Sequence, residues 1–257
     1  MNTSDRNEQP MIRPRTWFCL DLPVTDYQEA WRLQQALVPA RRDGILDRDL
    51  VIILEHTPVF TVGRRGGLDN LKIAAAMLEQ RGIDVVQVER GGDITYHGPG
   101  QLVVYPIIGL RNKRLGVADY VGNLEEVMIR TAREWDVAAN RDDRNRGVWV
   151  GNDKLGSIGV AVRHGVTFHG LALNVNLALA PFTWINPCGL QGVGMTSLER
   201  ESGERIFMDQ VRRAVKRHIE DVFRTRLEPV TPEDIESRIA PYSTHASGSE
   251  DPVVDSA

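Results

Sequence analysis

The sequence predicts an α/β fold in a single domain, because strand-like and helix-like stretches alternate along the chain. The 257 residues, 42% of them hydrophobic, are enough for one large domain with a sizeable core. No internal repeat and no second domain boundary interrupts the alternation. We therefore expect one folded domain over residues 15–230. A disordered polar leader at 1–14 precedes it, and an acidic, largely disordered tail at 231–257 follows it.

The charges and the apolar runs exclude several classes of function. The formal net charge is −4, but residues 231–257 hold six acids and one arginine, so the rest of the chain is close to neutral. A near-neutral body does not indicate a nucleic-acid partner. The polar start has no apolar leader core, and the longest apolar run, 102–110, is too short to span a bilayer. With two cysteines, Cys19 and Cys188, and no secretion signal, we expect a reduced cytoplasmic protein without membrane contact.

The first half of the chain is expected to alternate strands and helices. Alternating apolar residues predict strands, and apolar residues at helical spacing predict helices. Thr25 is the expected cap of the first helix, Pro39 its expected end, and Cys19 an expected core residue. The expected elements are a strand at 16–22, a helix at 25–39, buried strands at 50–56 and 58–64, a helix at 70–82 that Gly82 ends, and a strand at 83–89.

The second half contains a predicted hairpin. Residues 155–163 and 166–176 alternate on both sides of the turn Arg163-His164-Gly165. His218 lies in the apolar stripe of the final predicted helix, so packing is the expected role of its ring. The other expected elements are a core strand at 102–110, a basic loop at 111–114, a helix at 117–135, an exposed charged segment at 141–146, a strand at 147–151, a short helical turn at 195–198 and a helix that opens at Asp209.

A glycine-rich stretch, R-G-G-D-I-T-Y-H-G-P-G-Q at 90–101, follows the predicted strand at 83–89. Glycines let the backbone approach a ligand closely and expose amides as donors, although such clusters also mark ordinary turns. The segment R-R-G-G at 64–67 is a weak candidate for an anion site, and no phosphate loop of the Walker type occurs in the chain.

Lys154 and Cys188 are the only lysine and the only cysteine of the stretch 154–188, one at each end. A hairpin that folds back could bring the start of its first strand near the loop after its second strand. An ammonium beside a thiol favours the thiolate, whose normal pKa is about 8.5, so the pair is a candidate activated nucleophile. A buried structural cysteine and a solvated lysine remain the alternative.

Four motifs resemble those of the octanoyltransferases, also called lipoyl(octanoyl) transferases or the lipoate-protein ligase B family. They are K-L-G-S-I-G at 154–159, F-H-G-L-A-L-N-V-N at 168–176, N-P-C-G-L at 186–190, and R-G-G-x-x-T-x-H-G-P-G-Q at 90–101. The resemblance covers about residues 16–225. It implies a mixed β-sheet flanked by helices, similar to the catalytic domain of biotin and lipoate protein ligases.

The resemblance also implies the roles of individual residues. Cys188 would be the acyl-thioester nucleophile, and Lys154 would lower the pKa of its thiol and shuttle a proton. The residues implied to contact the substrate are Arg90, Gly91, Gly92, Asp93, Ile94, Thr95, Tyr96, His97, Ser157, Ile158, Gly159, Gly170, Leu171 and Ala172.

The implied reaction is acyl transfer in protein lipoylation by a monomer. An octanoyl or lipoyl group would pass from acyl carrier protein to a lysine of the lipoyl domains of 2-oxoacid dehydrogenase complexes and of the glycine cleavage H protein. No cofactor, ATP or metal is implied. The spacings of His97, His164 and His169 match no zinc motif, and no G-x-S-x-G elbow supports a serine hydrolase.

Two other functions fit a chain of this kind. An ATP-dependent lipoate or biotin protein ligase of similar fold would activate a free acid as an adenylate and would need no cysteine. A non-catalytic module would hold acyl chains without forming a bond to Cys188.

Overall fold

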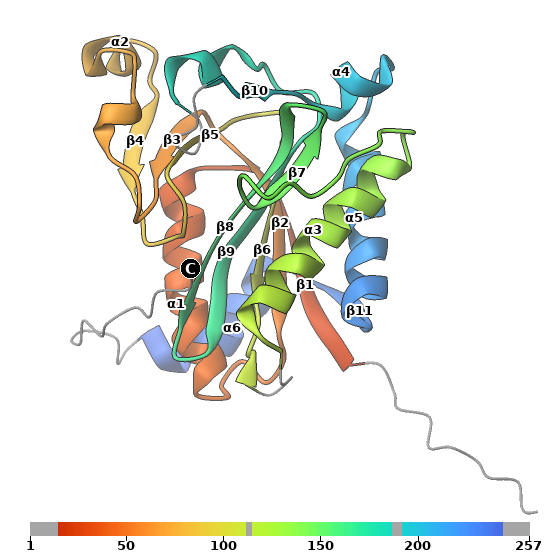
Figure 1. The fold of residues 1–257 in the computed structure, drawn as a ribbon. Helices are drawn as coiled ribbons and strands as arrows, with labels where there is room; N and C mark the ends of the chain where they lie inside the picture. The colour runs from red at the N-terminus through yellow and green to blue at the C-terminus, as the bar shows by residue number, and fades with distance from the viewer. Residues whose placement is uncertain (1–14, 112–114, 187–191, 244–257) are drawn as a thin grey trace, which may run out of the picture.

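A computed structural model describes residues 15–111, 115–186 and 192–243 of the chain. Its centre is an eight-stranded mixed sheet in the order β10-β8-β9-β6-β2-β1-β11, with β7 paired to β8 (Figure 1). A second sheet has the order β4-β3-β5. The large sheet consists of β1 (Arg15–Thr25), β2 (Leu50–His56), β6 (Gln101–Ile107), β7 (Gly147–Val150), β8 (Asp153–Arg163), β9 (Val166–Asn174), β10 (Gly194–Met195) and β11 (Thr225–Val230). The small sheet consists of β3 (Val59–Val62), β4 (Asp84–Gln87) and β5 (Ile94–His97).

Helices cover both faces of the large sheet, so the predicted α/β class is confirmed (Figure 1). On one face α3 and α5 pack on each other and on the sheet, and on the other face α1 packs on β9, β6 and α6. The helices are α1 (Tyr27–Arg42), α2 (Ala75–Glu79), α3 (Val117–Arg133), α4 (Leu198–Ser202), α5 (Met208–Phe223) and α6 (Pro232–Ser243). None of the helices in the described part of the chain has the length and apolar character needed to cross a membrane.

The strand β2 shows why its sequence is almost continuously apolar. Val51 and Ile53 belong to the core under α3 and α5, whereas Leu50, Ile52 and Leu54 belong to the core under α1 and α6. A strand between two helical layers buries both of its faces, so the two-residue alternation disappears. The prediction of a buried strand at 50–56 is confirmed.

The predicted hairpin is present as β8 and β9. Its two-residue turn is His164-Gly165, with φ of +52° and +84°. Positive φ at both turn positions matches the right-handed twist of the flanking strands, and glycine adopts it without strain. Arg163 and Val166 close the ladder on either side of the turn.

The first helix differs from the prediction at both ends. Asp26, not Thr25, is the N-cap, and its carboxylate accepts a hydrogen bond of 3.1 Å from the backbone N–H of Glu29. Pro39 lies inside α1, which continues to Arg42. A proline in the last turn removes one backbone hydrogen bond only, and the Pro39 carbonyl still accepts from the N–H of Asp43 at 2.9 Å.

Several short elements were predicted wrongly or not at all. The helix expected at 70–82 is reduced to the five residues of α2, after a 3₁₀ turn at Leu68–Asn70. The strand β5 lies within the glycine-rich stretch that was expected to be loop, and β11 was not expected. These elements are too short for periodicity to identify them, and β11 forms by pairing with β1 from the other end of the chain.

The prediction of a largely disordered tail from residue 231 is wrong for residues 232–243, which form α6. Ile235 and Ile239 lie four residues apart on one face of this helix and are buried against α1. The acidic residues around them are exposed. They make the segment polar on average, so the short apolar stripe was not recognised in the sequence. The predicted leader at 1–14, residues 112–114 of the basic loop, and residues 244–257 lie outside the described residues.

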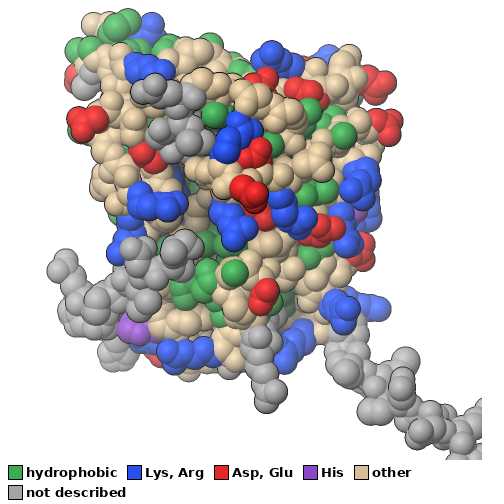
Figure 2. All heavy atoms as spheres, viewed as in Figure 1, with side chains coloured by type: hydrophobic (Ala, Val, Ile, Leu, Met, Phe, Trp, Pro, Cys, Tyr) green, Lys and Arg blue, Asp and Glu red, His purple; other side chains and the backbone are tan. Residues whose placement is uncertain are grey.

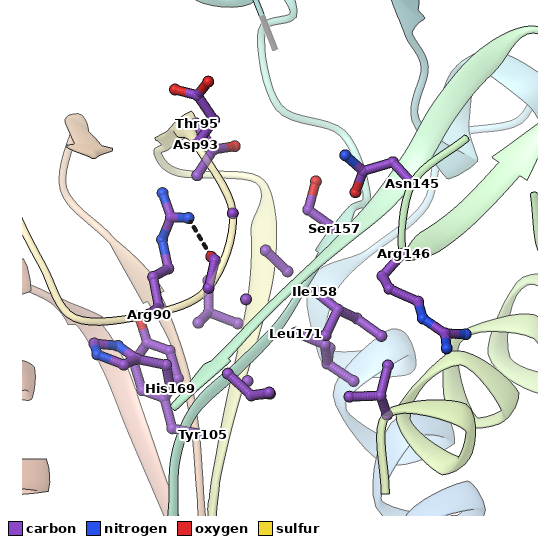
Figure 3. Close-up of a pocket in the computed structure, with 18 of the residues that line it drawn as sticks. Arg90, Asp93, Thr95, Tyr105, Asn145, Arg146, Ser157, Ile158, His169 and Leu171 are labelled. Carbon is purple, nitrogen blue, oxygen red and sulfur yellow. Dashed lines mark hydrogen bonds between the residues drawn. The ribbon is translucent and has the colours of Figure 1, made fainter. Parts of the chain in front are cut away.

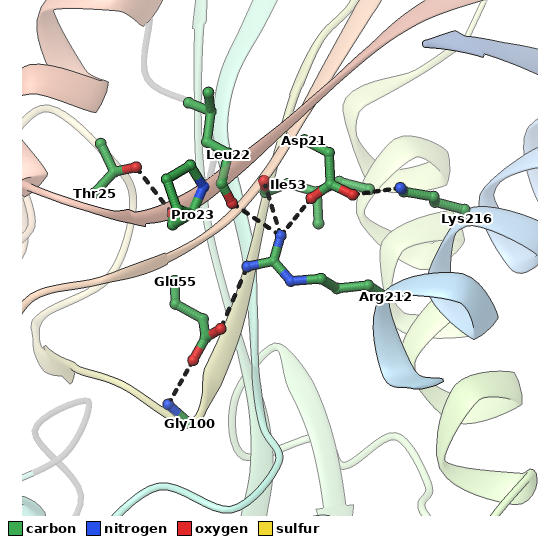
Figure 4. Close-up of polar contacts among 9 residues, drawn as sticks. All are labelled: Asp21, Leu22, Pro23, Thr25, Ile53, Glu55, Gly100, Arg212 and Lys216. Atoms are coloured by element: carbon green, nitrogen blue, oxygen red, sulfur yellow. Dashed lines mark hydrogen bonds and ion pairs between the residues drawn. The ribbon is translucent and has the colours of Figure 1, made fainter. Parts of the chain in front are cut away.

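A polar network joins α5 to the turn before β6 (Figure 4). The Arg212 guanidinium donates to Asp21, to the carbonyl of Leu22 at 3.0 Å and to Glu55 at 3.3 Å. Glu55 in turn accepts a hydrogen bond of 2.8 Å from the backbone N–H of Gly100. Helix α5 therefore helps to fix the glycine-rich stretch, which lies at the candidate site.

Candidate active site

A cavity of about 320 Å³ lies between the hairpin β8/β9, the glycine-rich stretch and helix α3 (Figure 3). This volume is at the lower end of the range for small-molecule pockets. Figure 2 shows charged side chains of both signs across the middle of the face seen in Figure 1, with hydrophobic side chains below them. The cavity is small and partly open to solvent, and Arg65, Arg90 and Arg146 are among the residues that line it.

Most of the residues that the motifs implied as substrate contacts are brought together here. They come from two segments, the glycine-rich stretch and the middle of the hairpin, where Ser157 pairs with Ala172, Ile158 with Leu171 and Gly159 with Gly170. Those that line the cavity are Arg90, Gly91, Gly92, Asp93, Ile94, Thr95, His97, Ser157, Ile158, Gly159, Gly170, Leu171 and Ala172.

Tyr96 does not line the cavity. Successive side chains of a strand point to opposite faces, and the ring of Tyr96 packs against Phe60 and Phe182 in the core of the small sheet, with centroid distances of 5.2 and 5.7 Å. The structure therefore places Tyr96 as a packing residue next to the site.

The Arg90 side chain packs across the hairpin and holds the glycine-rich stretch in place. It is 7% exposed, and its guanidinium donates to the carbonyl of Thr61 at 2.7 Å and to the hydroxyl of Thr61 at 2.8 Å. A Cβ at Gly159 would lie 2.8 Å from Arg90 Cδ, so a larger residue there would displace the arginine. Close packing of this side chain explains why the hairpin needs a glycine at this position.

One wall of the cavity is built from aromatic rings that sequence patterns did not assign to a substrate site. Tyr27 comes from α1, Tyr105 from β6 and His169 from β9. His169 Nε2 lies 3.6 Å from a Glu89 oxygen, beyond hydrogen-bond distance. In the sequence Tyr27 is one residue of an amphipathic helix and Tyr105 one of a core strand, so neither carries a local signal of its role.

Burial keeps this wall uncharged at neutral pH. It lowers the pKa of His97 well below its usual range, it lowers the pKa of His169, and it raises the pKa of Tyr105. His56, behind the wall, has its pKa lowered to about 4 by burial. The part of the cavity that these neutral rings line suits an apolar group better than a charged one.

Lys154 lies beside the cavity without lining it. Its side chain is 1% exposed, and its Nζ donates to the Oδ1 of Asn145 at 3.3 Å. The same nitrogen lies 5.2 Å from the centre of the Trp149 ring, a distance typical of a cation–π contact. Asn145 does line the cavity, so this side chain connects the buried amine with the space where a ligand would lie. Neither Asn145 nor Trp149 was recognised in the sequence.

Cys188 lies outside the described residues, so its distance from Lys154 is a prediction that the structure does not test. The flanking chain is described on both sides. Asn186 donates its backbone N–H to the carbonyl of Asn70 at 2.9 Å, and the carbonyl of Gly192 accepts from the Asn152 side chain at 3.2 Å.

Cys19 is confirmed as a core residue. It is 4% exposed in the core under α3 and α5, and burial raises the pKa of its thiol to about 11. His218, expected to pack, is partly buried and its Nε2 lies 2.5 Å from a Glu134 oxygen, so it joins α5 to α3.

Within the described ranges, no group of three or more His, Cys, Asp or Glu side chains is arranged to hold a metal ion.

Comparison with known proteins gives consistent matches. Residues 26–220 match the lipoyl protein ligase A/B catalytic domain. The chain is 52% identical over 208 residues to an octanoyltransferase of Desulfotalea psychrophila, a match that covers 80% of this chain and 93% of that protein. It is 44% identical over 223 residues to an octanoyltransferase of Syntrophobacter fumaroxidans, covering 87% and 97% of the two chains.

Solved structures share the fold at low sequence identity. A lipoate-protein ligase A bound with ATP superposes with a TM-score of 0.72 at 14% identity, over 90% of this chain and 95% of that chain. A putative lipoate protein ligase from T. acidophilum with bound lipoic acid gives a TM-score of 0.69 at 15% identity, over 90% and 95% of the chains. These likenesses establish the architecture that the motifs implied.

Proposed function

Because the chain belongs to the lipoyl protein ligase A/B catalytic domain family and is an octanoyltransferase, we propose that it carries the octanoyl group on Cys188. The donor is acyl carrier protein, and the acceptor is a lysine of a lipoyl domain, in 2-oxoacid dehydrogenase complexes or in the glycine cleavage H protein. The reaction is an acyl transfer within protein lipoylation.

The observation that carries this proposal is the position of Lys154. The Lys154 amine is buried and hydrogen-bonded to Asn145, which lines the cavity, so it lies beside the site and away from the solvent-exposed surface. The strand of Lys154 is paired with β10, which follows Cys188 in the sequence. A lysine in this place can favour the thiolate of a cysteine brought next to it.

The first step exchanges one thioester for another. The Cys188 thiolate attacks the carbonyl carbon of the octanoyl thioester, and the carrier sulfur leaves. The Lys154 ammonium gives a proton to the departing thiolate, which leaves Lys154 as a neutral amine. Because the bond broken and the bond formed are of the same kind, this step is nearly balanced in free energy and requires no ATP.

The second step forms the amide. The neutral amine of the acceptor lysine attacks the acyl-cysteine, and the neutral Lys154 takes up the proton that the new amide nitrogen releases. Cys188 leaves as a thiolate and the starting charges are restored. Conversion of a thioester to an amide runs downhill, so the cycle completes without a cofactor.

The cavity fits the acyl chain in this scheme. Its walls combine the hairpin residues Ile158 and Leu171 with the uncharged rings of Tyr105 and His169. A medium-length alkyl chain loses no hydrogen bonds on entering such a space, whereas a charged group would.

Intact-mass spectrometry tests the proposal. Incubation of the protein with octanoyl acyl carrier protein, without ATP, should add one octanoyl group to wild type and none to Cys188→Ser. Addition of a lipoyl domain should then remove the group from the enzyme and add it to the domain. Failure of the wild type to gain mass would contradict the acyl-cysteine.

The shared fold with a lipoate-protein ligase A bound with ATP favours one alternative, an ATP-dependent ligase. Such an enzyme would modify the lipoyl domain from free octanoate and ATP, and Cys188→Ser would leave it active. We expect no product from free octanoate and ATP. A non-catalytic acyl-binding module would bind the octanoyl chain and give no covalent product in either experiment.

A further inference from the structure

Two buried amide side chains face each other across the sheet next to the cavity. Gln101 of β6 and Asn174 of β9 are direct cross-strand partners, and they are 2% and 1% exposed. A buried polar group without a hydrogen-bond partner is destabilising, so buried amides in folded proteins have hydrogen-bond partners. The partners of this pair show what it holds together.

The orientation of both amides follows from carbonyl acceptors. Asn174 Nδ2 lies 2.9 Å from the carbonyl oxygen of Thr196, which can only accept, so the Asn174 oxygen faces Gln101. Gln101 Nε2 donates to that oxygen at 2.9 Å and to the carbonyl of Tyr96 at 3.2 Å. The Gln101 oxygen is therefore left to accept.

The remaining contact of Gln101 reaches the wall of the cavity. Its oxygen lies 2.7 Å from Nδ1 of His97, which must carry the hydrogen. In the neutral ring Nε2 is then an acceptor, and it lies 3.3 Å from the hydroxyl of Thr61. Thr61 itself accepts from Arg90. Each residue of this chain therefore donates a hydrogen bond to the next, from Arg90 through Thr61, His97 and Gln101 to Asn174.

The other end of this chain reaches the strand of Lys154. The backbone N–H of Thr196 donates to the carbonyl of Lys154 at 3.0 Å, and Met195 pairs with Lys154 in the parallel ladder of β10 and β8. Thr196 is thus held on one side by Lys154 and on the other by Asn174. Its segment is the one that follows Cys188 in the sequence, with Gly192 as the first described residue between them.

We propose that Gln101 and Asn174 are positioning residues for the transfer reaction, and that they fix the segment after Cys188 against the strand of Lys154. The inference rests on the proposed roles of Cys188 and Lys154. Gln101 and Asn174 do not touch the reacting atoms. They connect His97, in the wall of the acyl cavity, with Thr196, so the acyl site and the strand of Lys154 share one buried framework.

Asn174→Asp tests this role with a change of one atom. The carboxylate still accepts from Gln101 but cannot donate to the carbonyl of Thr196, and two acceptors then face each other. We expect kcat to fall at least about tenfold at pH 7.5, since the reacting groups lose their alignment. The KM for octanoyl acyl carrier protein should stay within about twofold of wild type, because the cavity walls are unchanged.

A pH series tests specifically whether the loss of kcat comes from the missing hydrogen-bond donor at position 174. A protonated carboxyl can donate to Thr196 while it accepts from Gln101, as the amide does. The ratio of variant kcat to wild-type kcat should therefore rise as the pH is lowered. A flat ratio across the pH range would contradict the hydrogen bond to Thr196 as the source of the loss.

Gln34→Glu is a matched control. Gln34 is fully buried, and its oxygen accepts from the backbone N–H of His169 on the same strand β9 at 2.7 Å, but it lies outside the chain from His97 to Thr196. The change from amide to acid is the same. We expect a comparable loss of thermal stability with kcat within about twofold of wild type.

The outcomes separate the two proposals. Normal kcat in Asn174→Asp, or an equal loss in Gln34→Glu, would overturn the positioning role while wild-type acylation of Cys188 stands. Absence of acylation in wild type would overturn the proposed function instead. If Asn174→Asp does not fold, Gln101→Glu replaces it, because this variant keeps the acceptor for His97 and removes both donors, and the same loss of kcat is expected.

Discussion

The environment of Lys154 combines burial with contacts to an amide and an aromatic ring. Its amine contacts the amide of Asn145 and the face of Trp149, both of which stabilise a positive charge without neutralising it. A positive charge at this place favours the ionised form of an acidic group beside it. In the proposed reaction that anion is the Cys188 thiolate.

Lys154→Met should therefore shift the reactivity of Cys188 to higher pH. Methionine keeps most of the volume of the buried side chain and removes its charge. We expect the pH of half-maximal alkylation of Cys188 to rise by about one unit or more, since one unit corresponds to a tenfold change in thiolate fraction. Peptide mapping after iodoacetamide treatment over a pH series measures this shift.

Lys216→Met is the control for that experiment. Lys216 lies on α5 and pairs with Asp21 of β1, and its charge partly offsets the effect of burial, which raises the pKa of the other cysteine, Cys19. The profile of Cys188 should not change in this variant. An unchanged profile in Lys154→Met would remove Lys154 from the mechanism.

Cys19 provides the opposite case at the residue scale. With its pKa raised to about 11, this thiol is protonated at neutral pH and acts as a small apolar side chain. Cys19→Ala should keep turnover near the wild-type value and lower the free energy of unfolding by about 1 kcal/mol. Steady-state kinetics and urea denaturation check both values. A large loss of turnover in a folded variant would assign Cys19 a role in the reaction.

Among the elements, helix α5 is tied to the sheet by Arg212 (Figure 4). The Arg212 side chain is 11% exposed and its partner Glu55 is 15% exposed, so both charges are largely removed from water. Loss of one partner leaves the other charge buried without compensation.

Arg212→Met should lower the free energy of unfolding by about 2 kcal/mol or more, because Glu55 then lacks its cation. Urea denaturation measures the loss. Arg217→Met on the same helix is the comparison, since Arg217 is 56% exposed in its pair with Glu134 and should contribute less than about 1 kcal/mol. Equal losses of unfolding free energy in the two variants would show that burial of the Arg212 network adds nothing to stability.

At the scale of the whole molecule, the buried histidines make stability depend on pH. His56 donates through Nδ1 to the carbonyl of Thr25 at 2.9 Å, and its Nε2 accepts from the hydroxyl of Tyr105 at 2.7 Å, so the neutral ring is fully used. Burial lowers its pKa from 6.5 to about 4. Well above pH 6.5 neither the folded nor the unfolded state binds this proton, and the contribution of His56 to stability is complete.

Below pH 6.5 the unfolded state takes up the proton first, so stability should fall until the pH reaches about 4. The contribution of His56 to this fall is about 3 kcal/mol, and His97 and His169, whose pKa values are also lowered, add to it. Urea denaturation at pH 7.5 and pH 5 should show about 2 kcal/mol of the His56 contribution, because pH 5 lies above the folded-state pKa. The loss of stability between the two pH values should be smaller in His56→Gln and unchanged in His164→Asn. The second variant replaces the exposed turn histidine, whose φ of +52° asparagine tolerates. A pH-independent stability in wild type would contradict the buried neutral cluster.

The long periodic elements were predictable from the sequence, and the short ones were not. Strand β2 is recognised as a continuous apolar run, helix α3 and the hairpin β8/β9 repeat their patterns over many residues, and glycine at the second turn position marks the turn at His164-Gly165. In contrast, β5, β11 and α6 are short or mostly polar. They exist because partners from elsewhere in the chain complete their hydrogen bonds or cover two isoleucines.

The sequence by itself determined the order of the large elements, the α/β class and the motifs that identify the family, because each depends on residues close together in the chain. The tertiary structure decided the rest of the site. It placed Tyr27, Tyr105 and Asn145 around one cavity, turned Tyr96 away from it, and kept the histidines of the wall neutral. Burial and the distance between partners set these properties, and both arise only when segments far apart in the chain pack against each other.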